Sequence, residues 1–250
     1  YLCDKENNEI LLPNAYVTLC MEIGKAVDVF IYHDSENRLV ASTLYPHARV
    51  GEFALMEVTD ISSFGAFVDW GLPKELFVPL KYQKSPFKTG QKRVIFVTLD
   101  ELTNRVIGVE KFGKFLPKST PKFTQNEKVE LFILAKTPLG IKVIINNRYE
   151  GMLYQNEIFE EIDIGDKKEG YIKKIRTDGK IDVSLQPTGE SAELTAQTKV
   201  LEVLRKNDYK MLCSTKSSPE EIYKTFGISK KSFKQVINNL KREGLIQVKQ

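Results

Sequence analysis

The chain has 250 residues, of which 42% are hydrophobic and 28% charged, a composition typical of globular proteins. Three cysteines that lie far apart and two histidines argue against a disulfide framework, a CxxC zinc site and most histidine-based catalysis. No stretch approaches 18 consecutive apolar residues, which excludes a membrane-spanning helix.

The charge is distributed unevenly along the chain. Residues 199–250 carry 12 basic and 5 acidic side chains, whereas residues 1–198 carry 25 basic and 28 acidic ones. A basic C-terminal quarter is typical of a surface that binds a polyanion, and equally of a solvated lysine-rich face. Charge alone leaves both interpretations open.

Three segments share the same spacing of marker residues. A glutamate is followed by a glycine 15 residues later and by a basic residue 29 or 30 residues later: Glu9, Gly24 and Arg38; Glu75, Gly90 and Arg105; Glu150, Gly165 and Lys180. A short alternating segment follows each glycine and each basic residue. Fixed offsets in three places indicate internal repeats of about 65 residues.

The repeats predict small β domains. In the second repeat we expect strands at 52–59, 66–70, 77–80, 94–98 and 106–109, and five such strands suit an OB-type barrel. In the first repeat we expect strands at 27–31 and 39–41, and in the third at 170–174 and 181–185. Only eight residues precede Glu9, so the first domain is expected to be incomplete.

Residues 57–71, with the run Phe64-Gly65-Ala66-Phe67-Val68, closely resemble the RNA-binding domain of the ribosomal protein S1 type. The resemblance implies a five-stranded OB barrel that binds single-stranded RNA. Phe64 and Phe67 lie three residues apart across a turn, where they are candidates to stack on bases. The alternative is that both are barrel core.

Charged residues near this motif are candidates to contact RNA. Lys81 and Lys84 lie in a stretch from 74 to 93 that holds one acidic residue, Glu75. Asp100 and Arg105 stand where the S1-type family has an aspartate and an arginine, with one extra residue between them. In the first repeat Asp34 and Arg38 match that spacing better.

The repeats depart from the S1 pattern in two places. Pro79 stands where the family has a histidine, and the third repeat has Leu139-Gly140-Ile141-Lys142-Val143 in place of the aromatic run. We therefore expect the third repeat to act mainly as scaffold. Residues 111–123 interleave lysine and phenylalanine, and we favour a connector pinned to a barrel over a path for a phosphate backbone.

The C-terminal quarter changes to a helical period near residue 195. Ser218 and Pro219 predict a helix start, Gly227 predicts its end, and Ser229 predicts the cap of a further helix. That helix has an apolar face at 233, 236, 237 and 240 and precedes an expected strand at 245–248. This order is typical of a winged helix-turn-helix.

The polar face of the last helix carries candidate nucleic-acid contacts: Lys230, Lys231, Ser232, Lys234, Lys241 and Arg242. The alternative is a winged helix that only packs on a barrel or on a partner protein. The fold class is thus mostly β with an α+β end. We expect a partial first S1-like OB domain at 1–47, a second at 48–116, a divergent third at 123–189 and a winged helix at 195–250.

S1-like repeats followed by a winged helix, with the segments 216–220 and 228–234, resemble the CvfB/YitL family of bacterial proteins. The resemblance implies RNA binding and post-transcriptional control of gene expression, including virulence genes. We expect a monomer in the reducing cytoplasm whose partner is single-stranded RNA, with no membrane partner. The alternative is a DNA-binding transcription regulator that uses the OB domains as scaffold. We expect no enzymatic activity, catalytic residue, metal site or cofactor, because no constellation of residues in catalytic roles is present.

Overall fold

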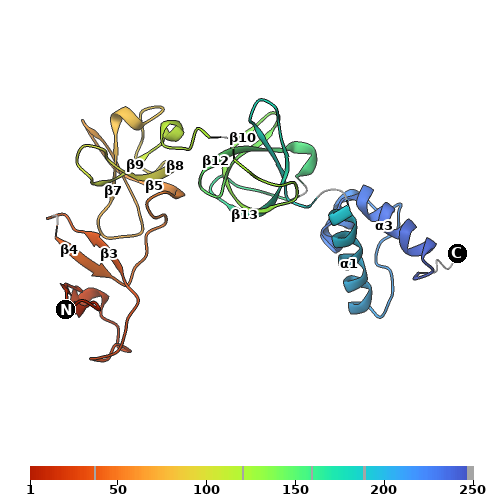
Figure 1. Cartoon of the computed structure of the whole chain (residues 1–250), viewed down its shortest axis with the longest axis horizontal. Helices are drawn as coiled ribbons and strands as arrows, with labels where there is room; N and C mark the ends of the chain where they lie inside the picture. The colour runs from red at the N-terminus through yellow and green to blue at the C-terminus, as the bar shows by residue number, and fades with distance from the viewer. Residues whose placement is uncertain (37, 120, 159, 188–189, 247–250) are drawn as a thin grey trace. The chain divides into compact units, whose positions relative to one another are not determined.

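The computed structural model describes residues 1–36, 38–119, 121–158, 160–187 and 190–246. The chain forms two compact units, Tyr1–Leu116 and Pro117–Gln250, and each is described by itself. Figure 1 labels several elements of each unit and colours the chain from red at the N-terminus to blue at the C-terminus. The mostly β architecture with helices at the C-terminal end confirms the expected fold class.

The first 47 residues form two small hairpins. Strand β1 (Leu2–Cys3) pairs with β2 (Glu9–Ile10), and β3 (Phe30–His33) pairs with β4 (Leu39–Ser42). A 3-10 turn, η1 (Asn14–Tyr16), lies between them in sequence, and Leu11 bridges to Val40. The expected strand at 39–41 is present, but the one expected at 27–31 begins only at Phe30. The register explains this shift, because Phe30 already pairs with Ser42, the last residue of β4.

The second repeat forms a five-stranded antiparallel sheet that nearly closes on itself. Its strands are β5 (Phe53–Ser62), β6 (Gly65–Val68), β7 (Leu76–Pro79), β8 (Lys92–Leu99) and β9 (Val106–Val109), in the order β7-β6-β5-β8-β9. The two edge strands, β7 and β9, lie against each other. Two 3-10 turns, η2 (Leu80–Tyr82) and η3 (Phe112–Lys114), follow β7 and β9.

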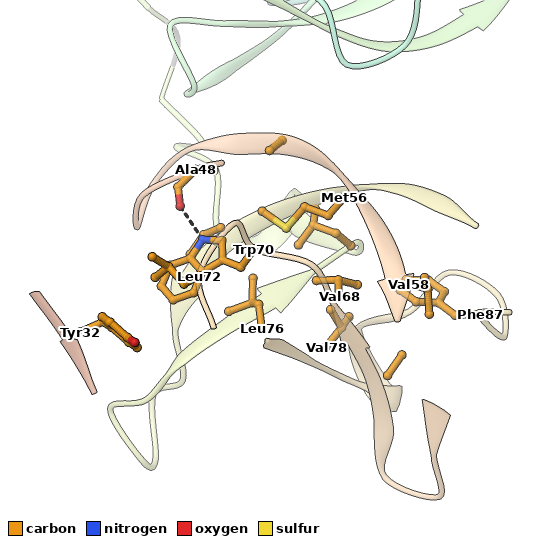
Figure 2. Packing of buried hydrophobic residues seen from close by; sticks show 14 of the residues in the cluster. Tyr32, Ala48, Met56, Val58, Val68, Trp70, Leu72, Leu76, Val78 and Phe87 are labelled. Atoms are coloured by element: carbon orange, nitrogen blue, oxygen red, sulfur yellow. Dashed lines mark hydrogen bonds between the residues drawn. The ribbon is translucent and has the colours of Figure 1, made fainter. Parts of the chain in front are cut away.

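Trp70 anchors the core of this barrel. Its indole Nε1 donates a hydrogen bond to the carbonyl oxygen of Ala48 at 2.7 Å, as Figure 2 shows. The ring of Phe30 meets Trp70 edge-on at 6.2 Å, and Tyr32 and Val40 belong to the same buried cluster. The β3–β4 hairpin therefore shares a hydrophobic core with the second barrel.

The third repeat forms a closed barrel. Its strands are β10 (Lys128–Thr137), β11 (Gly140–Ile145), β12 (Tyr149–Tyr154), β13 (Lys167–Ile175) and β14 (Ile181–Ser184), in the order β10-β11-β12-β14-β13. Strand β12 pairs with β14 in parallel, and η4 (Gln155–Glu157) follows β12. The divergence of this repeat from the S1 pattern thus lies in its side chains, not in its fold.

Three α-helices follow β14 within the described residues: α1 (Glu190–Lys206), α2 (Pro219–Phe226) and α3 (Lys230–Arg242). Helix α1 begins five residues before the expected start and packs against α3 (Figure 1). Ser218 and Glu221 form a reciprocal capping box at α2, and Gly227 ends it in the left-handed conformation with φ 62°. Ser229 caps α3, as its position in the sequence predicts.

The strand expected after α3 is not formed at Leu245 and Ile246, so that part of the expectation is wrong. Gly244 reverses the chain with φ 71°, and the amide of Leu245 donates back to the carbonyl of Leu240 at 2.9 Å. This helix-terminating bond holds the chain close to α3. The remaining residues of the expected strand, 247 and 248, lie outside the described residues.

Candidate nucleic-acid interface

Two phenylalanines stand side by side on the outer face of the second barrel. Along β6 and β7 the side chains alternate, with Ala66, Val68, Leu76 and Val78 buried in the core. Phe67 and Phe77 occupy the outward positions and are direct cross-strand partners. Their ring centroids are 5.3 Å apart with the planes tilted by 46°, and both rings are half-buried.

Phe64 lies in the β5–β6 turn, directly before β6, where it is 79% exposed. The turn is held by Ser62, whose hydroxyl donates to the carbonyl of Gly65 at 3.2 Å and accepts from the amide of Phe64 at 3.3 Å. We call Phe64, Phe67 and Phe77 the aromatic face. The sequence motif contains the first two residues, whereas the sequence alone indicates only a core or rim position for Phe77. The alternation along β7, with Leu76 and Val78 buried, turns Phe77 outward.

The two lysines expected beside the motif lie just after β7. The Lys81 ammonium stands 4.7 Å from the centre of the Tyr82 ring, and the Lys84 ammonium stands 4.9 Å from that of Phe112. Lys81 is also 4.0 Å from a carboxylate oxygen of Asp100. The structure therefore brings Lys81 and Asp100 together, although 19 residues separate them.

Asp100 serves mainly to hold its own turn. Its carboxylate accepts from the amides of Leu102 and Thr103, each at 3.0 Å. These bonds, led by that of Thr103, lower the pKa of Asp100 below its ordinary value. The turn is one residue longer than in the first repeat and contains Asn104 at φ 53°. Asp100 engages backbone amides and Lys81, and the exposed Arg105 side chain is close enough to Lys74 for its charge to act on it.

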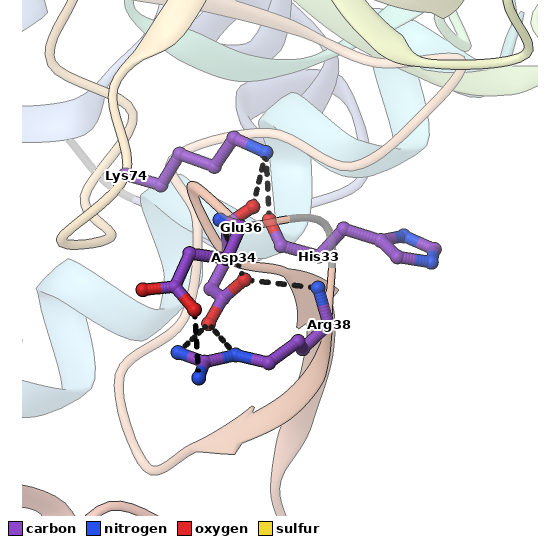
Figure 3. Close-up of polar contacts among 5 residues, drawn as sticks. All are labelled: His33, Asp34, Glu36, Arg38 and Lys74. Atoms are coloured by element: carbon purple, nitrogen blue, oxygen red, sulfur yellow. Dashed lines mark hydrogen bonds and ion pairs between the residues drawn. The ribbon is translucent and has the colours of Figure 1, made fainter.

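In the first repeat the corresponding aspartate and arginine form a close pair (Figure 3). The Arg38 guanidinium donates to one carboxylate oxygen of Asp34 through Nε at 2.9 Å and Nη2 at 2.7 Å. The Arg38 amide, with this guanidinium and the Glu36 amide, lowers the pKa of Asp34. Arg38 also meets the carboxylate of Glu36 at 2.8 Å, so its charge is already compensated.

Lys74 joins the two repeats at this point. Its ammonium donates to the carbonyl oxygens of His33 and Asp34, each at 2.8 Å, as Figure 3 shows. Partial burial lowers the pKa of Lys74, and the positive charge of Arg105 adds to that effect. The expected site residues of the first repeat and Arg105 of the second therefore lie in one neighbourhood.

The third barrel presents a different set of side chains at the matching positions. Leu139, 68% exposed, and Lys142, also exposed, replace the two phenylalanines of the motif. Tyr154 stands at the position of Pro79, and its hydroxyl contacts the guanidinium of Arg176, which also donates to Asp182 at 2.9 Å. This surface offers cations and one tyrosine instead of an aromatic pair.

Helix α3 buries one face and exposes cations on the other. Phe233, Val236, Ile237 and Leu240 are buried, whereas the expected contacts Lys231, Lys234, Lys241 and Arg242 are exposed. Lys230 is half-buried and points its ammonium toward the carbonyl of Lys216 at 3.5 Å. Ser232 is also half-buried, and its hydroxyl meets that of the cap residue Ser229 at 2.9 Å. Four of the six expected positions are thus exposed to solvent.

Within the described ranges, no cluster of three or more histidine, cysteine, aspartate or glutamate side chains is placed to hold a metal ion. In the same ranges, no helix has both the length and the apolar composition needed to cross a membrane.

Comparison with known proteins supports the domain types. Residues 198–250 match the CvfB-like winged helix domain, and residues 1–44 match an S1 domain. The chain is 28% identical to "Uncharacterized protein YitL" of Bacillus subtilis, over 98% of this chain and 85% of that protein. It is 25% identical to "Conserved virulence factor B" of Staphylococcus saprophyticus, over 91% of this chain and 79% of that protein. The chain resembles the CvfB/YitL family over nearly its whole length.

A solved structure described as a multidomain protein with nucleic acid binding domains from Streptococcus pneumoniae is 27% identical, with a TM-score of 0.38. The match covers 99% of this chain and 90% of that one. The family models and the two curated relatives confirm the resemblance to the CvfB/YitL family expected from the sequence. The S1 and winged helix domains that the chain shares with this family belong to nucleic-acid-binding domain families.

Proposed function

We propose that this CvfB/YitL-like chain is a non-enzymatic bacterial protein that binds single-stranded RNA through the aromatic face of its second barrel. The observation that supports this most directly is the Phe67–Phe77 ring pair on the outer surface beside the exposed Phe64. Unpaired bases present flat faces that stack on such rings, and a contact of this kind is worth about 1–3 kcal/mol per base. Lys81 supplies a cation next to the same surface.

The names of the relatives support a proposal for the role in the cell. Several proteins that match across most of the chain are called conserved virulence factor B. We propose that RNA binding serves post-transcriptional control of gene expression, including virulence genes, in the cytoplasm. A monomer is sufficient for this, because several weak modules on one chain raise affinity through effective concentration.

A second candidate function is transcription regulation through duplex DNA. The exposed cations of α3, Lys231, Lys234, Lys241 and Arg242, support it, because a helix of this kind can enter a major groove. Readers of this class usually pair two half-sites, so this function favours a dimer. The two candidates therefore differ both in ligand and in oligomeric state.

Fluorescence anisotropy with labelled single-stranded RNA, single-stranded DNA and duplex DNA of equal length separates the candidates. The wild type is compared with Phe64→Ala/Phe67→Ala and with Lys231→Ala/Lys234→Ala. Tyr45→Ala, which removes an aromatic side chain 48% exposed outside the barrel strands, is the matched control. For RNA binding we expect the phenylalanine pair to weaken affinity by about 5- to 150-fold for one lost stacked base, with little change in salt dependence.

A DNA-binding transcription regulator would give the opposite result. A preference for duplex DNA, lost in the lysine variant and kept in the phenylalanine variant, would establish the transcription regulator. Sedimentation of the free protein adds an independent readout, since a dimer favours the DNA function. If the wild type binds none of the three ligands, both proposals are wrong.

A further inference from the structure

Two segments of the first unit are clamped together next to the aromatic face. The amides of Glu110 and Lys111 both donate to the carbonyl oxygen of Tyr82, at 3.0 and 2.9 Å. In return the amide of Lys84 donates to a carboxylate oxygen of Glu110 at 2.6 Å. Glu110 is 8% exposed, and its carboxylate lies 3.5 Å from the Arg93 guanidinium, which compensates its charge. The turn η2 and the segment that contains η3 therefore form one local structure.

This clamp gathers ammonium groups around aromatic rings. Lys81 and Lys114 stand 4.7 and 5.0 Å from the centre of the same Tyr82 ring, and Lys114 also donates to its hydroxyl at 3.2 Å. The Phe115 ring meets Tyr82 edge-on at 5.7 Å, and Lys111 reaches the carbonyl oxygen of Lys81 at 3.4 Å. We call these residues and Lys84 the Tyr82 cluster: Lys81, Tyr82, Lys84, Lys111, Lys114 and Phe115.

The positive charge of the cluster exceeds the negative charge that faces it. Asp100 and Glu101 approach Lys81 and Lys114 only to 4.0 Å, the outer limit of an ion pair. The side chains of Lys81 and Lys114 are 59% and 52% exposed. Ammonium groups held on one ring repel each other, and an anion bound between them relieves that repulsion. The cluster is thus suited to a ligand with regularly spaced negative charges.

The cluster continues directly from the aromatic face. The amide of Leu80, the residue before Lys81, donates to the carbonyl oxygen of Phe64 at 2.9 Å. A strand whose bases stack on Phe64, Phe67 and Phe77 would therefore meet Lys81 and Tyr82 next. We propose that the Tyr82 cluster binds the phosphate backbone of single-stranded RNA where it leaves the aromatic face, extending the site along the chain. This inference rests on the proposed function.

The segment that contains η3 is pinned to the barrel, as the connector interpretation expects, and it presents cations on either side of the pinned ring. Phe112 is 4% exposed and its ring meets Phe53 edge-on at 4.9 Å, which fixes η3 on the barrel as a connector would be fixed. Lys111 and Lys114 flank this anchor and stay exposed. Because η3 is anchored on the barrel, the backbone of the segment is already ordered before RNA binds. This lowers the entropic cost of binding.

The test uses Lys81→Ala/Lys114→Ala in the full chain, with Lys5→Ala/Lys25→Ala as a control of equal charge change outside the barrel strands. The probes are labelled oligouridylates of roughly 6 and roughly 14 nucleotides, within the range that one OB fold covers. Both lysines are more than half exposed, so we expect folding to be unchanged, which circular dichroism checks. Lys81→Arg/Lys114→Arg keeps both charges and serves as the rescue variant.

For the wild type we expect the longer probe to bind more tightly than the shorter one. In the alanine variant this gain should be lost. The slope of log affinity against log salt should become shallower by about 0.7 for each phosphate contact removed. The control and the arginine variant should keep the tighter binding of the longer probe and the salt dependence of the wild type. An unchanged slope and length dependence, or an equal loss in the control, would overturn the inference.

The result also separates this inference from the proposed function. If the wild type binds neither probe, the proposed RNA function itself fails. If it binds both, and Phe64→Ala/Phe67→Ala weakens binding while the lysine variant behaves as wild type, the aromatic face stands, and the Tyr82 cluster is wrong together with the role given to Lys81.

Discussion

The ring of Phe77 lies over Gly65 on the neighbouring strand. A Cβ atom at position 65 would stand 2.8 Å from Cε2 of Phe77 and closer still to the carbonyl oxygen of Val78. Such contacts are far shorter than van der Waals distance, and the second one involves backbone that cannot rotate away. The missing side chain at Gly65 is therefore what allows Phe77 to lie beside Phe67 on the aromatic face.

Gly65→Ala tests this relationship. The added methyl group must push β7 away, so we expect a loss of about 1–3 kcal/mol in the free energy of unfolding and weaker binding of single-stranded RNA. Urea unfolding followed by the fluorescence of Trp70 measures the first effect, and anisotropy measures the second. Gly113→Ala is the matched control, because nothing lies within 4 Å of a Cβ there. Unchanged stability and binding in Gly65→Ala would contradict the prediction.

The charge pair of the first repeat predicts a pH dependence. Because the pKa of Asp34 lies below 3.8, its ionised form stabilises the folded protein at higher pH, and this contribution is lost as the pH falls from about 3.8 through the folded-state value. Asp34→Asn keeps an oxygen for the amides of Glu36 and Arg38 but loses the charge. We expect its melting temperature to lie below that of the wild type near neutral pH and to approach it in strong acid.

Glu36→Gln serves as the control for this experiment. The carboxylate of Glu36 also pairs with Arg38, but its side chain is 71% exposed, and exposed ion pairs contribute little. We expect a melting temperature close to that of the wild type across the pH range. A gap between Asp34→Asn and the wild type that persists at low pH would show that the charge is not its cause.

The capping box of α2 predicts a local effect in the winged helix. The hydroxyl of Ser218 accepts from the amide of Glu221 at 3.2 Å, and the Glu221 carboxylate accepts from the amide of Ser218 at 3.0 Å. Ser218→Ala should cost about 0.5–2 kcal/mol of helix stability, whereas Ser218→Thr keeps the hydroxyl and should cost less. Unfolding followed by the helical circular dichroism signal measures the difference. Equal loss in both variants would mean that the cap bond is not responsible.

Local signals in the sequence predict the features that one short segment determines. The caps of α2 and α3 follow from Ser218, Gly227 and Ser229, and the strand predicted at 106–109 is β9. The same holds for the turn that exposes Phe64, because the motif itself contains the turn residues. The CvfB/YitL resemblance likewise rests on contiguous motifs, and it is confirmed.

Features that depend on the pairing of distant segments could not be predicted from the sequence. The position of Phe77 opposite Phe67 depends on the register of β6 against β7. The Tyr82 cluster depends on amide hydrogen bonds between segments 28 residues apart in sequence. The start of β3 depends on where β4 ends. In each case the residue types were visible, but the partner that orients them was not.

The third barrel offers a gain-of-function test of the stacking proposal. Leu139 and Lys142 stand where Phe64 and Phe67 stand in the second barrel, both are exposed, and the fold beneath them is the same five-stranded type. Leu139→Phe/Lys142→Phe should therefore add a stacking surface without entering the core. We expect tighter binding of single-stranded RNA by about 1–3 kcal/mol for each base newly stacked, and a smaller salt dependence because one cation is lost. Leu139→Met/Lys142→Met, which adds exposed apolar surface without rings, separates stacking from general hydrophobic contact. Equal affinity of the two variants for labelled RNA would show that exposed rings at these positions are not what binds bases.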